Sequence, residues 1–269
     1  MYEIVIDFLK KYHPEDLELF NEMIRNRRIV KVDGLNEFED RLLGQCSHIY
    51  KGLPFIITQE SAITLDSIRC LIHEFGHASD MSDLNKKFSI NQMSKYFFLS
   101  GKTEVPSMLY ERQLIDFFIE EKINLSFIPY LLEDYYEIIE KSLLECYFFS
   151  LLDDWFIYKS NYLKCDEGIF DYINNKELRE VFSSDIDINT IDMRSSFRYA
   201  LGGLVSLILI EKLKTDKDQG NKILTNFMNN RCRSFDDVFI EQLEYCDGDL
   251  ERIVSKDHQL VKKYINFDC

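Results

Sequence analysis

The sequence predicts a mainly α-helical domain with one small β-element. Only four prolines and ten glycines interrupt its 269 residues, and long stretches space their apolar side chains at helical intervals. One short apolar stretch, residues 53–58 (LPFIIT), has the composition of a strand instead. The length suffices for a sizeable core, and no linker, repeat or low-complexity segment divides the chain. We therefore expect a single domain over residues 1–269.

Two amphipathic helices are expected before the strand, over residues 2–12 and 14–28. The second begins with a proline followed by acidic residues, a composition that favours the start of a helix. Bulky apolar side chains on both helices need a surface to cover, so we expect the pair to pack on the core. His13, which lies between them, is expected at the surface.

Helices are expected in most of the remaining chain. Residues 64–81 have apolar side chains at helical spacing and no proline, which predicts a helix directly after an edge strand at 53–58. Further helices are expected at 104–121, 131–162, 169–182, 191–214, 217–230, 235–245 and 250–265. The many aromatic residues of 131–162 are expected to fill the core, with the lining of a peptide cleft as the alternative.

The helix at 64–81 carries the motif HEFGH at residues 73–77. Residues four apart lie on one face of a helix, so His73 and His77 can bind one cation while Glu74 reaches a water molecule on it. A zinc ion would lower the pKa of that water to near neutrality, and Glu74 would act as the general base. The motif therefore predicts one Zn²⁺ per chain and a zinc-dependent metalloendopeptidase.

Catalytic zinc needs a third protein ligand, and two candidates compete for the role. The metzincin pattern HExxHxxGxxH would place a glycine at position 80 and a histidine at position 83, where this chain has Asp80 and Asp83. Asp83 could still coordinate zinc, but the missing glycine removes the turn that brings it back. Glu104, at the start of the helix expected at 104–121, is the favoured ligand, in a His₂Glu set.

Several further motifs occur in a fixed order along the chain. After HEFGHA at 73–78 come EVPS at 104–107 and Glu111, and YALG stands at 199–202. Before them lie a glycine-containing segment at 44–46 and the strand at 53–57. In these motifs the chain resembles the zinc oligopeptidase family that includes thimet oligopeptidase and oligoendopeptidase F. The resemblance covers residues from about 40 to about 230 and implies a helical zincin-type metallopeptidase catalytic domain.

The resemblance also implies roles for residues outside HEFGH. Tyr199 is expected to contact the transition state, and Glu111 is expected either to orient a zinc ligand or to be a solvated helix charge. Asp80 stands where the family usually has a histidine, and a carboxylate there could hold a ligand histidine in the right tautomer. The family's histidine and tyrosines before YxxG, which stabilise the oxyanion, are missing from residues 188–198.

Two arginines could replace those missing groups. Arg194 and Arg198 are four residues apart, and together they could supply cationic stabilisation of the oxyanion. The alternative is that they pair with the excess acid of this chain. One oxyanion donor contributes about two to three orders of magnitude in rate, so the choice bears on turnover.

Members of the resembled family are much longer than this chain, because a helical N-terminal lobe closes one wall of their channel. We therefore expect either an open cleft that takes extended substrates or a partner chain, such as a second copy in a homo-oligomer, that completes the wall.

Composition narrows the partners and the location. A net charge of −15 disfavours nucleic acid, which needs a basic face, and it could attract cationic peptides or serve solubility alone. Seven cysteines without CxxC spacing are expected to be reduced thiols. No signal peptide or membrane span is expected. A cytoplasmic protein without membrane attachment is therefore expected.

The sequence thus predicts a zinc-dependent metalloendopeptidase that cleaves oligopeptides or flexible peptide segments, with a specific precursor peptide as one candidate substrate. An extended substrate would lie along the strand near Pro54–Thr58. The alternative is a non-catalytic, zinc-containing peptide-binding or regulatory protein that has lost its oxyanion groups. The intact Glu74 favours the enzyme, because a binding protein has no chemical need for a base.

Overall fold

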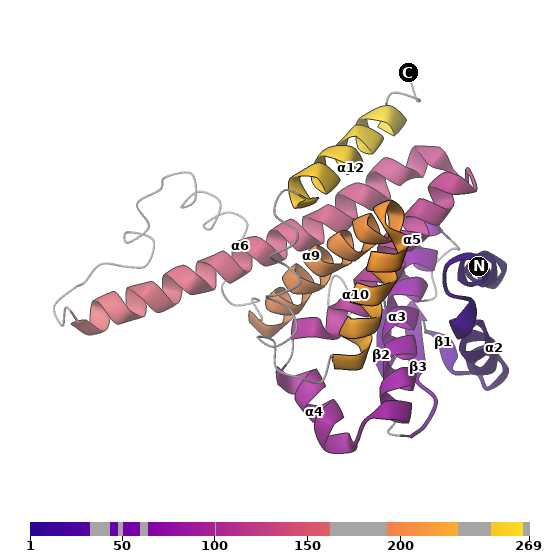
Figure 1. Cartoon of the computed structure of the whole chain (residues 1–269), viewed down its shortest axis with the longest axis horizontal. Helices are drawn as coiled ribbons and strands as arrows, with labels where there is room; N and C mark the ends of the chain where they lie inside the picture. Colours follow the sequence, from indigo (N-terminus) through magenta and orange to yellow (C-terminus); the bar gives the residue numbers. More distant parts are fainter. Residues whose placement is uncertain are drawn as a thin grey trace.

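The computed structural model describes residues 1–32, 44–47, 51–59, 64–99, 101–161, 193–230 and 249–265. Helices dominate, and a small three-stranded sheet is inserted among them (Figure 1). In chain order the elements are α1 (Tyr2–Tyr12), η1 (Pro14–Asp16), α2 (Leu17–Arg25), β1 (Ile29–Val32), β2 (Gly44–Ser47), β3 (Phe55–Gln59), α3 (Leu65–Lys87), α4 (Ile90–Leu99), η3 (Gly101–Thr103), α5 (Glu104–Glu120), η4 (Leu125–Phe127), α6 (Ile128–Asn161), α9 (Met193–Thr215), α10 (Lys217–Asn230) and α12 (Asp249–Ile265). The predicted fold class, mainly α-helical with a small β-element, is confirmed. The helices expected at 169–182 and 235–245 lie outside the described residues.

The sheet has the strand order β1-β3-β2, with β1 parallel and β2 antiparallel to β3. The strand expected at 53–58 is present as β3, but its expected edge position is wrong, because β3 pairs on both sides. Its partners were not recognised because each has four residues and β2 begins with a glycine. Among the described strands, β2 is the edge next to α3, and it pairs with β3 from Gly44 to Ser47.

Helix α3 begins with a capping box between Thr64 and Ser67, whose side chains each accept from the other's main-chain N–H. The helix continues to Lys87, beyond the expected end at Met81. No proline or glycine stops it there, and Asp83 and Lys87 form an ion pair at 3.0 Å in its last turns. A long, well-capped helix is therefore the platform for the HEFGH motif.

The N-terminal helices pack on the opposite side of α3 and α5 from α9 (Figure 1). Phe20 of α2 meets Phe75 of α3 edge-to-face, with ring centroids 5.1 Å apart, and Phe8 of α1 meets Phe117 of α5 at 5.9 Å. The helix expected at 14–28 is broken, because η1 precedes α2 and the chain turns after Arg25 toward β1. The apolar faces of these helices thus complete one side of the core.

His13 is only 6% exposed, which corrects its expected position at the surface. The ring stacks flat on Tyr110, with centroids 3.8 Å apart, and its Nε2 hydrogen-bonds Gln113 Oε1 at 2.6 Å. The turn between α1 and α2 therefore lies against α5 rather than in solvent.

Helix α5 is the centre of the molecule, with α3, α6 and α9 all packed on it. Nearly every residue from Glu104 to Phe118 is buried. A Cβ added to Gly76 of α3 would lie 2.6 Å from Ser107 Cα, and one added to Gly202 of α9 would lie 2.6 Å from Glu104 Cβ. Both glycines let a neighbouring helix approach the main chain of α5 more closely than any side chain permits.

Helix α6 runs across the other helices, and its C-terminal part projects past them (Figure 1). Tyr135 and Phe148 on it are buried, as expected for core residues, whereas Leu143 and Tyr147 are exposed. The expectation that its aromatic residues fill the core is therefore correct for the part that lies over α5 and α9. Across the described residues, no helix combines the length and the apolar character that a membrane span requires.

We expect Gly76→Ala to destabilise the fold by about 2–3 kcal/mol, because the new methyl group would collide with main-chain atoms of α5 that cannot rotate away. Thermal or denaturant unfolding would measure the loss. Gly203→Ala is the contrast, because its clash at 2.3 Å is with the Ile139 side chain, so Ile139→Ala should partly rescue it. An unchanged unfolding midpoint for Gly76→Ala would show that the close approach of α3 and α5 is not required.

Candidate metal centre

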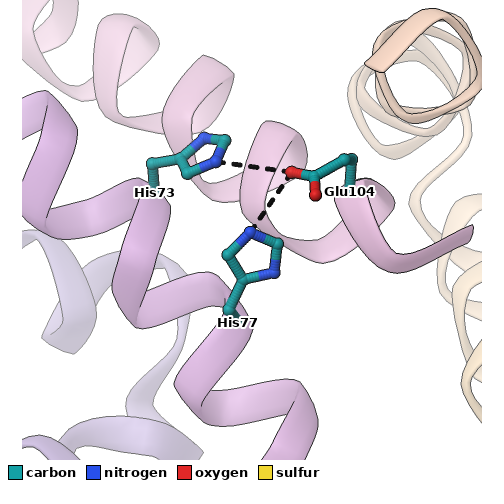
Figure 2. A group of neighbouring side chains, drawn as sticks. All are labelled: His73, His77 and Glu104. Atoms are coloured by element: carbon teal, nitrogen blue, oxygen red, sulfur yellow. Dashed lines mark ion pairs between the residues drawn. The ribbon is translucent and has the colours of Figure 1, made fainter. Parts of the chain in front are cut away.

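His73, His77 and Glu104 converge at the crossing of α3 and α5 (Figure 2). Glu104 Oε2 lies 3.4 Å from His73 Nε2 and 3.2 Å from His77 Nε2. One donor atom from each residue falls within 4.8 Å of the others, so all three can reach a single ion. Two imidazole nitrogens and one carboxylate oxygen are the donor set of catalytic zinc sites, so the residues fit a zinc ion.

The first turn of α5 holds Glu104 in place. Ser107 Oγ lies 3.1 Å from Glu104 Oε2 and 2.9 Å from its main-chain oxygen, so this hydroxyl secures the residue from within its own helix. Gly202 of α9 lies directly against Glu104, with no side chain between the two helices. The candidate ligand therefore has little conformational freedom.

Glu111 lies two turns beyond Glu104 on the same face of α5. Its carboxylate binds the other nitrogen of His73. His73 Nδ1 lies 2.8 Å from Glu111 Oε2, which leaves Nε2 directed at Glu104. Glu111 is almost fully buried, so the alternative of a solvated helix charge is wrong. A carboxylate on the far nitrogen fixes the tautomer and orientation of a metal-binding histidine.

Arg69 supports Glu111, and sequence reasoning did not single it out. Its Nη1 donates to Glu111 Oε1 at 2.6 Å, and the same buried guanidinium pairs with Asp66 of α3 and Asp134 of α6. Its position one turn before His73 is the one sequence signal that could have identified it. Opposite charges offset the cost of burying this cluster and connect three helices behind the site.

Glu74 lies on the side of α3 that faces the sheet. A Cβ on Gly44 of β2 would meet Glu74 Cγ at 2.9 Å and Cys70 Sγ at 2.7 Å, so the edge strand passes directly over this side chain. Glu74 is largely buried but is not a member of the three-residue group. The carboxylate therefore lies beside the edge strand β2. Gly44 is a second residue that the sequence reasoning took only as part of a loop.

Tyr199 of α9 stacks on His73, with ring centroids 6.2 Å apart and planes 19° from parallel. The negative charge of Glu104, followed by burial, raises the pKa of its phenol well above the ordinary value of 10. Tyr199 is therefore protonated at neutral pH and can donate a hydrogen bond. Its neighbour Arg198 is half-buried on the same helix. The side chain of Arg194 is not among those that the structure describes. Roles for all three in stabilising an oxyanion stay predictions.

Asp80 and Asp83 lie further along α3. Tyr96 of α4 donates a hydrogen bond to Asp80 Oδ2 at 2.9 Å, which attaches α4 to the helix that carries the histidines. Asp83 pairs with Lys87, and in the described part of the chain it is Glu104, not Asp83, that completes the group at His73 and His77. The metzincin-like alternative is therefore not supported, and the role predicted for Asp80 stays a prediction.

The carboxylates around the site change its proton affinity. Burial alone would lower the pKa of His73, but its hydrogen bonds to Glu104 and Glu111 outweigh burial and raise the pKa to about 10. The pKa of His77 is likewise raised, chiefly by Glu104 against the effect of burial. The pKa of Glu104 is well below its usual value, because the two imidazoles outweigh burial. Without a metal ion, protons would balance the negative charge here.

Comparisons with known proteins agree with this geometry at the level of the fold. No protein-family model matches the sequence, and no curated protein matches it. Among solved structures, the chain is similar to a "putative oligoendopeptidase F" from Bacillus anthracis str. Ames, with 18% sequence identity and a TM-score of 0.55. The match covers 97% of this chain and 45% of that one, so this chain spans less than half the length of its structural neighbour. The likeness shows the fold alone: this chain shares the helical architecture of that structure.

We expect Glu111→Gln to weaken zinc binding by about 10–100-fold, because the neutral amide no longer increases the basicity of His73. Competition with a chelator of known affinity would measure the change. Glu133→Gln, an exposed site on α6, is the matched control and should leave affinity unchanged. Equal affinity in the Glu111→Gln variant would mean that Glu111 does not act on the metal site.

The pKa shifts also predict how the metal-free fold responds to pH. A folded-state histidine pKa raised from 6.5 to about 10 contributes stability that is fully present below pH 6.5 and is lost as pH rises toward 10. The EDTA-treated protein should therefore have a lower melting temperature at pH 9 than at pH 7. A His73→Gln, His77→Gln variant should lack this component. An identical pH response in the variant and the parent would contradict the assignment.

Proposed function

We propose that this protein is a zinc-dependent metalloendopeptidase. The observation that carries the proposal is the convergence of His73, His77 and Glu104 on one point, with Glu74 beside it and an open strand edge next to Glu74. The similarity to an oligoendopeptidase F fold supports the same reaction class.

In this proposal each residue has one task. His73, His77 and Glu104 would hold Zn²⁺, which when bound polarises a peptide carbonyl and acidifies a water molecule. Glu74 would accept the proton of the attacking water and later donate it to the departing amine. Glu111 and Arg69 would keep the ring of His73 in its productive tautomer.

Tyr199 is the leading candidate for stabilising the oxyanion. Its ring lies against His73, and its phenol is held in the protonated, hydrogen-bond-donating form. Donors aimed at the developing negative charge contribute more in a buried site than in water. Arg198, which precedes it on α9, would be the candidate source of positive charge for the oxyanion.

The position of the edge strand supports an extended peptide as substrate. Strand β2, rather than the segment near Pro54–Thr58, has an unpaired edge among the described strands, and its first residue lies against Glu74. A peptide that added to this edge by main-chain hydrogen bonds would pass the general base. Gly44 keeps the strand close to this base, because a Cβ there would collide with Glu74 and Cys70.

The charge of the chain bears on the substrate class. A net charge of −15 would favour cationic peptides or flexible tails. A cleft that is open or completed by a partner chain, and a specific precursor peptide as substrate, are parts of the same proposal. A cytoplasmic location is part of the same proposal.

Glu74→Gln should lower cleavage of a mixed peptide library by about 10²–10⁴-fold while leaving the zinc content of the parent unchanged, because only the general base is removed. Mass spectrometry of the digest and elemental analysis would measure both quantities. Glu133→Gln serves again as the control for a surface glutamate. Zinc binding without cleavage in either protein, across the library, would support the alternative, a zinc-containing peptide-binding protein.

A further inference from the structure

The turn between α1 and α2 contains a second group of potential metal ligands, away from the HEFGH motif. His13, Glu15 and Asp16 each offer one ligand atom, and these atoms lie within 4.8 Å of one another. All three belong to η1 or its N-cap, so the chain presents them from a single short turn. We propose that this turn binds a divalent cation of the Zn²⁺ or Mn²⁺ class through His13 Nδ1 and the carboxylates of Glu15 and Asp16.

The imidazole of His13 is held in the orientation of a metal ligand. Its Nε2–H donates to Gln113 Oε1 at 2.6 Å, and its ring stacks on Tyr110 with the planes 12° apart. In the neutral ring this hydrogen bond leaves Nδ1 as the nitrogen with a free lone pair. A polar partner on the far nitrogen is the usual companion of a metal-binding histidine.

The lone pair of Nδ1 faces negative charge. The nearest carboxylate oxygen, Glu15 Oε1, lies 3.9 Å away, which is too far for a hydrogen bond. An acceptor nitrogen that is buried beside two carboxylates is electrostatically unfavourable on its own. A divalent cation between them would replace this repulsion with three coordination bonds.

The two carboxylates differ in freedom. Asp16 accepts a hydrogen bond from the hydroxyl of Tyr110, so the ring that stacks on His13 also positions this second ligand. Glu15 is mostly exposed and can close over an ion from solvent. His13 and Asp16 are held in place, and Glu15 is exposed. A cation could therefore enter from solvent and then be enclosed by Glu15.

A cavity of about 290 Å³ opens beside this turn, lined in part by His13, Glu15 and Asp16. Asp80 and Asp83 of α3 also line it, together with Lys87, which pairs with Asp83. The cavity provides a path for a hydrated cation and room for the water ligands that three protein donors leave necessary. Donors that mix one imidazole with carboxylates suit Zn²⁺ or Mn²⁺ better than purely oxygen-seeking ions.

The proposed ion would stabilise the turn between α1 and α2, which contacts α5 through Tyr110. Tyr110 contacts both His13 and Asp16, and the next residue along α5 is Glu111, which binds His73. The inference stands whether or not the HEFGH site is catalytic, because it uses none of the residues of that site.

The test is the metal stoichiometry of the full chain, measured by elemental analysis after gel filtration with Zn²⁺ and, separately, with Mn²⁺. A His73→Gln, His77→Gln variant should retain about one equivalent of at least one of these ions, and adding His13→Gln should abolish it. The ion should also raise the melting temperature of the double variant but not of the triple variant.

A second, independent measurement uses the chain without the His73 and His77 substitutions. With the HEFGH site intact, His13→Gln should lower the total by one equivalent, whereas His258→Gln, an exposed histidine on α12, should leave it unchanged. Loss of all metal from the double variant, or equal stoichiometry in the parent and in His13→Gln, would overturn the proposal.

Discussion

The burial of Glu104 between two histidines is the constraint on which the rest of the structure depends. An isolated carboxylate could not be buried there, because removing its charge from water is too costly without positive partners. His73 and His77 supply those partners from one helix. Glu111 then balances the charge of His73, and Arg69 balances the charge of Glu111. The chain of alternating charges fixes how α3, α5 and α6 can lie, and the apolar core fills in around them.

Close helix packing makes this arrangement possible. Gly76 and Gly202 bring α3 and α9 against the first turn of α5 from two sides, so the ligand helix is held at its main chain rather than by interlocking side chains. Gly44 does the same for the strand that crosses Glu74. These three glycines thus determine how closely α3, α9 and β2 approach their neighbours around the site. The charged residues determine its chemistry.

The sequence predicted the parts of this site that depend on local patterns. Helical spacing located α3 and α5, and the motif residues His73, His77 and Glu104 indeed meet. The edge strand was misplaced because pairing between β1, β2 and β3 is set by contacts distant in sequence, to which a four-residue strand contributes little local signal. Arg69 and the burial of His13 were missed for the same reason, since their partners lie on other helices.

The link between α5 and α12 bears on the order in which the molecule can be assembled. Arg112 of α5 is almost fully buried, and besides Asp116 it binds Asp257 of α12 through two nitrogens. Tyr136 of α6 donates to the same Asp257. A buried guanidinium that lacks part of its counter-charge is strongly destabilising. During synthesis on the ribosome, the helix that begins with Glu104 therefore cannot reach its final packing until α12, far downstream, has emerged and docked.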